Sequence, residues 1–100
     1  MTRQFIIAVD GATLPQRDAF TASLQEMGSV AWWHFLSDLW LITDTQPKKM
    51  GPAEWRDAAR RYMPAAFVFV QEVGTGLWAI YGPEVGFKWL QDYWGGATRG

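Results

Sequence analysis

The sequence predicts one α+β domain spanning residues 1–100, in which strands and helices alternate. Short apolar runs bounded by Gly, Pro or Asp indicate strands, and longer segments with apolar residues three or four positions apart indicate helices. Seven Trp residues and a hydrophobic content of 49% supply one core, and there is no Cys to reinforce it with disulfides.

The first strand is predicted over 4–10, because a continuous apolar run there ends in an Asp-Gly turn sequence. The first helix is predicted over 13–27. Thr13 and Gln16 fit a capping box at its start, and Gly28 suits the position after its end. Its apolar stripe consists of Phe20, Leu24 and Met27.

A hairpin follows, with strands predicted over 30–35 and 39–43. Neighbouring residues of a strand point to opposite faces of the sheet. Trp32 and Trp33 therefore cannot both pack under the same helices. The apolar residues of this hairpin require cover on both faces.

A second helix is predicted over 52–63, with Pro52 at its first position and Glu54 complementing the dipole. A strand over 65–73 completes a core of residues 4–73. An extension over 77–94 is predicted to add a strand (77–81) and a helix. That helix carries Val85, Trp89, Leu90, Tyr93 and Trp94, and Trp89 is expected on its apolar stripe.

This order, with one helix between the first two strands and another between the last two, is that of the ferredoxin-like βαββαβ sandwich. In such a sandwich one sheet face meets water, yet here both faces carry apolar groups. We expect that face to be covered by the 77–94 extension, by a second copy of the chain in a homodimer, or by another protein.

Few residues suggest chemistry. Asp10, at the end of a strand, is a candidate metal-binding or nuclease residue, although a simple turn role is favoured because no second acidic residue lies at a motif-like spacing. His34, the single histidine, could act as a general base, but a hydrogen-bonded ring on the strand is favoured. The sequence predicts no metal site and no cofactor.

Basic residues gather on and before the second helix, at Lys48, Lys49, Arg56, Arg60 and Arg61. They are candidates for binding single-stranded nucleic acid, with Trp55 stacking a base. A solvated helix face is favoured, because Asp57 can pair with Arg61 and Trp55 lies on the apolar stripe. The net charge of −1 also argues against non-specific duplex binding.

The favoured function is therefore a non-enzymatic protein-interaction module, expected to be a homodimer, that binds another protein through buried aromatic anchors or through a sheet edge. The predicted contact residues are Trp32, His34, Trp40 and Trp78. The N-terminus lacks the features of a signal peptide, and no stretch is long enough to span a membrane. The cytoplasm is the expected location.

The motifs WWHF at 32–35 and LWLI at 39–42, with LWAIYG at 77–82 and WL at 89–90, resemble small bacterial and phage proteins, some labelled SinR-like. That resemblance suits a phage-encoded accessory protein that binds or inhibits a host factor. More distantly, the first strand ending in Asp10 resembles the ferredoxin-like nucleases of CRISPR adaptation. This resemblance implies homodimerisation and metal binding at Asp10, but the chain lacks the basic character of those nucleases.

Overall fold

The computed structural model describes residues 2–47, 50–74 and 82–94. Each predicted core element is present with ends shifted by at most two residues. The elements are β1 (Arg3–Asp10), α1 (Leu14–Met27), β2 (Val30–Leu36), β3 (Leu39–Asp44), α2 (Pro52–Tyr62), β4 (Phe67–Val73) and α3 (Glu84–Tyr93). The predicted strand over 77–81 lies outside the described residues.

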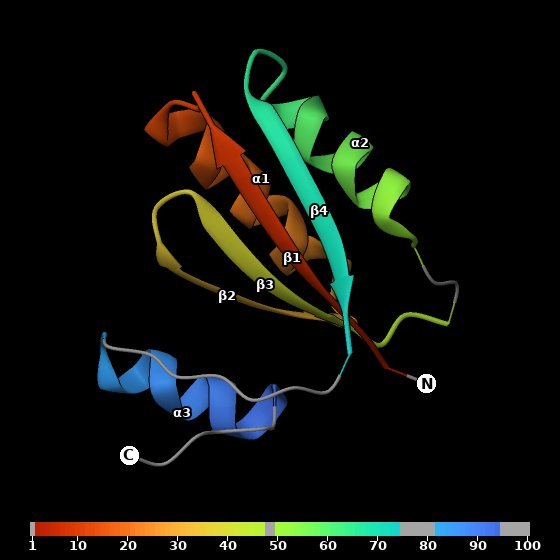
Figure 1. Cartoon of the computed structure of the whole chain (residues 1–100), viewed down its shortest axis with the longest axis vertical. Coiled ribbons are helices and arrows are strands. Elements are labelled where there is room, and N and C mark those ends of the chain that lie inside the picture. Colours follow the sequence, from red (N-terminus) through yellow and green to blue (C-terminus); the bar gives the residue numbers. More distant parts are fainter. Residues whose placement is uncertain (1, 48–49, 75–81, 95–100) are drawn as a thin grey trace.

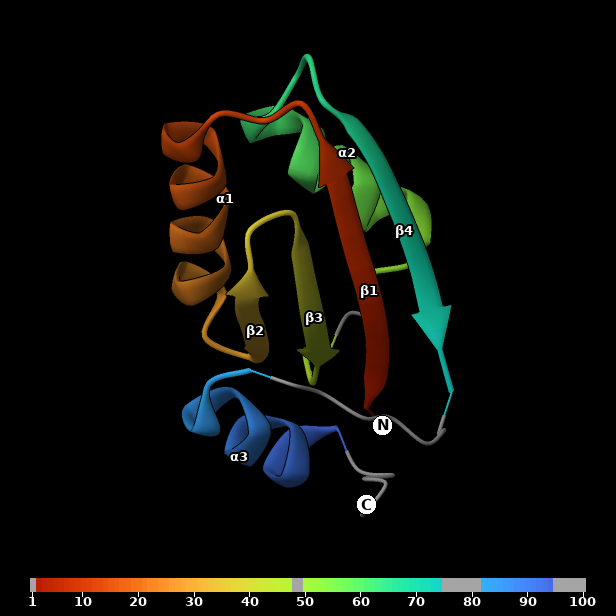
Figure 2. The same cartoon turned by 60° about the vertical axis from the view of Figure 1, so that its left-hand side comes forward.

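The four strands form one antiparallel sheet in the order β2-β3-β1-β4 (Figures 1 and 2). Strands β1 and β2, which flank α1 in the sequence, are therefore separated in the sheet by β3. Likewise β1 lies between the strands that flank α2. This order leaves β2 and β4 as the two edges of the described sheet.

Helices α1 and α2 cover one face of the sheet and enclose the main core (Figure 2). The two largest side chains of that core are Trp40 and Trp55. The Trp40 ring meets Phe20 edge-on at a centroid distance of 5.1 Å. Trp55, on the buried side of α2, packs against Phe5 of β1. The other buried members are Ile7, Val9, Leu24, Ile42, Ala59 and Met63.

Helix α3 lies apart from the other two helices and contacts β2 from the opposite face (Figure 1). Trp32 pairs with Ile42 on the face beneath α1 and α2, whereas Trp33 pairs with Leu41 on the face toward α3. The prediction that neighbouring tryptophans point to opposite faces is confirmed. The extension supplies a covering layer for Trp33.

The buried side of α3 differs from the prediction. Gly86 and Leu90 are its buried residues, while Val85 and Tyr93 are exposed and Trp89 is only half-buried. Of the apolar residues named for this helix, Leu90 is buried, whereas the buried Gly86 was missed because only large apolar residues were counted. A glycine lets α3 approach the bulky rings of β2 closely.

The predicted helix ends are confirmed for α1. The hydroxyl of Thr13 accepts from the Gln16 amide, and the Gln16 side chain accepts in return from the Thr13 amide at 2.9 Å. Gly28 has a φ of +72°, a conformation that few other residues adopt. In α2 the Glu54 carboxylate accepts from the Gly51 amide.

Candidate interaction surface

Strand β4 presents two exposed aromatic side chains at the edge of the sheet. Phe67 is 80% exposed and Phe69 is 59% exposed. Both lie on the face opposite α1 and α2, because Phe67 pairs with Asp10 and Phe69 pairs with Ala8. Helix α3 covers this face at the other edge, near β2, and contacts β4 little if at all. Phe35 and Leu36 of β2 are also exposed, but less than Phe67 and Phe69, so β4 has the most exposed apolar side chains of the described strands.

Shallow hollows border β4 on both faces. One, of about 250 Å³, is lined by Ala8, Asp10, Phe67 and Phe69 together with the valines between them. The other, of about 400 Å³, lies between β4 and the first turns of α2 and is lined by Pro52, Ala53, Arg56 and residues 68–70. We call β4 with these two hollows the β4 edge surface.

The two edges of the sheet differ in their protection. The pairing of β2 with β3 is interrupted between Trp33 and Leu36, and β2 contacts α1 on one side and α3 on the other. Strand β4 pairs with β1 in one continuous register of seven residues. It contains no Pro, no Gly and no Lys. Irregular pairing and such residues are common devices against edge-to-edge association, and β4 lacks them.

The carboxylate of β4 is engaged within the domain. Arg3 donates from Nε to Glu72 at 2.7 Å and also donates from its terminal nitrogen. This hydrogen bond holds the pKa of Glu72 below its ordinary value and raises the pKa of Arg3. The negative charge of the strand is therefore balanced by a neighbouring cation.

The flank of α2 above β4 is basic. Arg56 lines the hollow there, and Arg60 follows one turn later on the same side of the helix. Arg56 pairs with Asp57 at 3.0 Å, with both side chains more than half exposed. The predicted pairing of Asp57 with Arg61 was wrong. Arg60 makes no ion pair with the described part of the chain.

The predicted hairpin contact residues are placed differently. Trp40 is fully buried, so its prediction as a contact residue was wrong: the pleat of β3 turns it under α1. His34 is half-buried and stacks on Trp40, with ring centroids 4.2 Å apart. Its Nδ1 lies 3.0 Å from the Leu39 carbonyl oxygen, which only accepts, so Nδ1 donates. Trp32 is half-buried against the core. Trp78 lies outside the described residues.

The remaining candidates do not form a chemical site in the described chain. Asp10 is exposed beside Phe67, and no group of three potential metal-ligating side chains occurs among the described residues. Trp55 is fully buried, so it is not available to stack on a base. Arg56 and Arg60 are exposed. Lys48 and Lys49 lie outside the described residues.

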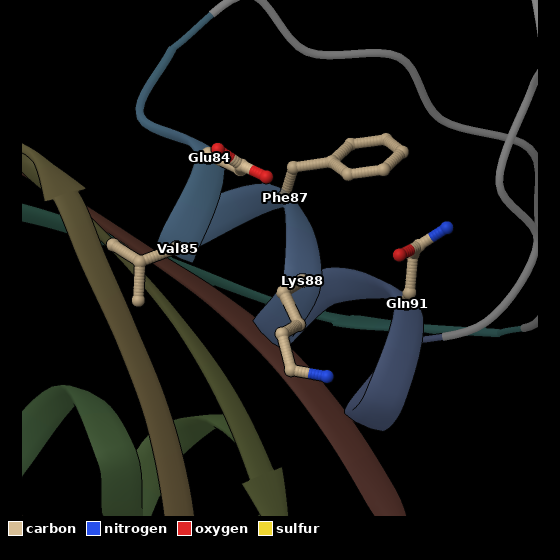
Figure 3. A pocket seen from close by; sticks show the side chains of 5 residues that line it. All are labelled: Glu84, Val85, Phe87, Lys88 and Gln91. Atoms are coloured by element: carbon tan, nitrogen blue, oxygen red, sulfur yellow. The ribbon is translucent and has the colours of Figure 1, made fainter.

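A third hollow, of about 590 Å³, lies on the outer side of α3 and is lined by Glu84, Val85, Phe87, Lys88 and Gln91. Figure 3 shows that these side chains spread in different directions instead of converging on one point. All five come from one helix, and no residue of the sheet lines it. The β4 edge surface differs in combining a strand with a helix.

Phe67 and Phe69 were recognised from the sequence as strand residues but not as contact residues. The signal that could have found them is their alternation with Val68 and Val70 in the last core strand. In the predicted strand order, that strand lies at an edge.

Comparison of the chain with protein-family models, with curated proteins and with solved structures finds no match. None of the described helices has both the length and the apolar character needed to cross a membrane. The geometry of the surface therefore carries the functional argument.

Proposed function

We propose that this protein is a non-enzymatic interaction module that binds a partner protein at the β4 edge surface. The single observation that carries the proposal is the pair of exposed rings, Phe67 and Phe69, on an edge strand of the described sheet. Aromatic side chains contribute large contact areas to protein interfaces. An unpaired strand edge additionally offers backbone hydrogen bonds to an incoming chain.

We further propose that the architecture is a ferredoxin-like βαββαβ sandwich extended by α3. The proposal is supported by the antiparallel order β2-β3-β1-β4 and by the positions of α1 and α2 between their strands. In this sandwich β4 occupies an edge, which is the position the interaction requires. The cytoplasm remains the proposed compartment.

The experiment compares partner capture by tagged wild-type protein with capture by Phe67→Ser and Phe69→Ser variants. The bait is incubated with extracts of its native host, and co-purifying proteins are quantified by mass spectrometry. We expect each serine variant to lose at least about tenfold of the specific partner signal, as removal of a central aromatic anchor does at other interfaces.

Val85→Ser is the matched control, because Val85 is 64% exposed but lies on α3, near the other edge of the sheet. It should retain the partner signal. Trp32→Ala should also retain it, provided that circular dichroism shows a folded protein. Capture that is unchanged in both phenylalanine variants would contradict the proposed function.

A further inference from the structure

We infer that the β4 edge surface binds an extended peptide segment in which acidic and apolar residues alternate. This inference rests on the proposed function and specifies the chemistry of the partner. Residues of an added strand point alternately to the two faces of the sheet. The two faces that flank β4 differ in character, so they select different side chains at alternate positions.

On the face opposite α1 and α2, an added strand meets apolar surface. Phe67 and Phe69 project there beside Ala8, and the adjoining hollow is lined largely by apolar residues. Of the described residues that line this hollow, only Asp10 is ionisable, at the end where it pairs with Phe67. Apolar side chains of the incoming strand would bury both rings.

On the other face, an added strand meets α2. The hollow there is lined by Val68, Val70, Ala53 and Arg56, and Arg60 follows one turn later on the same side of the helix. The nearby carboxylates are Glu72, which is bound by Arg3, and Asp57, which pairs with Arg56 in an exposed contact. A carboxylate on the incoming strand would therefore find two cations and little opposing charge.

The same charges argue against a second copy of this chain as the occupant. Two antiparallel β4 strands related by a twofold axis would place both α2 helices on the same side of the joined sheet. The Arg56 and Arg60 flanks would then face each other as like charges. Glu72 of the copy would be held by its own Arg3 instead of being available to them.

The test measures binding of two short, capped, fluorescent peptides to the whole protein by fluorescence anisotropy. In one peptide valine alternates with glutamate, and in the other valine alternates with lysine. We expect the glutamate peptide to bind about tenfold more tightly, since each exposed charge pair contributes modestly. Its addition should shift the NMR amide signals of residues 67–73 most strongly.

The double variant Arg56→Glu with Arg60→Glu should reverse the preference in favour of the lysine peptide. Arg61→Glu is the matched control, because Arg61 belongs to the same helix but lines a different hollow with Glu54 and Asp57. It should keep the preference of the wild type. Phe69→Ser should weaken the binding of both peptides.

Equal binding of the two peptides, or binding of neither, would overturn the inference. So would a dimer, detected by analytical ultracentrifugation, that Phe69→Ser converts to a monomer, because a second copy would then occupy the edge. The proposed function would still be supported if Phe67→Ser and Phe69→Ser lose the partner signal in the capture experiment. Failure of the inference is thus distinguishable from failure of the proposed function.

Discussion

The indole Nε1 of Trp33 donates a hydrogen bond to the carbonyl oxygen of Gly86 at 3.1 Å. This buried contact joins β2 to α3, and its two residues lie 53 positions apart in the chain. At the other end of α3, the Gln4 side chain donates to the Tyr93 carbonyl oxygen at 3.1 Å. Hydrogen bonds thus hold α3 at both ends, and of the two edge strands of the described sheet it packs against β2.

Gly86→Ala should weaken the docking of α3. A Cβ at this position would lie 3.1 Å from both Trp33 Nε1 and Phe35 Cδ2, which is closer than ordinary packing. Alanine favours the helix by about 1 kcal/mol, but overpacking costs about 1–3 kcal/mol, so we expect a net loss of about 1 kcal/mol. Urea unfolding followed by tryptophan fluorescence measures this loss in the free energy of unfolding. Val85→Ala, on the exposed side, should change little, and a more stable Gly86→Ala protein would contradict the close contact.

Replacement of Trp33 by Phe should cost more stability than replacement of Trp32 by Phe. Replacement of the buried Trp33 removes a hydrogen bond as well as volume, whereas Trp32 is half-buried and its indole makes no hydrogen bond with the described residues. We expect a loss of about 2 kcal/mol for Trp33→Phe and less than half of that for Trp32→Phe. Equal losses in chemical denaturation would show that α3 does not stabilise this face.

Thr21→Val should destabilise the main core through Trp40. The Thr21 hydroxyl accepts from the Trp40 indole nitrogen at 3.0 Å, and valine would leave that buried N–H without its partner. We expect a loss of about 1–3 kcal/mol in the free energy of unfolding. Ser23→Ala is the control, because the Ser23 hydroxyl bonds only to the Phe20 carbonyl of its own helix. If both variants lose a similar amount of unfolding free energy, the hydrogen bond to Trp40 does not stabilise the core.

The ion pair between Arg3 and Glu72 predicts a pH dependence. The pKa of Glu72 is lowered in the folded protein by the hydrogen bond from Arg3. Its stabilising contribution is therefore complete above the ordinary glutamate range and is lost as the pH falls through the lowered pKa. NMR titration of the Glu72 carboxyl should give a midpoint below that of a free glutamate side chain. Arg3→Gln should raise this midpoint, and an unchanged midpoint would contradict the pairing.

Much of the local structure follows from the sequence. The capping box of Thr13 and Gln16, the positive φ of Gly28 and the opposite orientations of Trp32 and Trp33 depend on short-range geometry, so neighbouring residues suffice to predict them. The need for a second covering layer also follows from the alternation of strand side chains. The burial of Gly86 in α3 was not predicted, because its contact with Trp33 depends on two distant segments.

The sequence by itself determined the order of the elements, their approximate ends and the excess of apolar surface on both sheet faces. Only the tertiary structure decided where that excess remains open. Trp40 and Phe69 are both aromatic residues of apolar strands, yet one is fully buried beneath α1 and the other is 59% exposed at an edge. The difference arises because burial depends on which helix covers which strand, and periodicity within one strand carries no information about that packing.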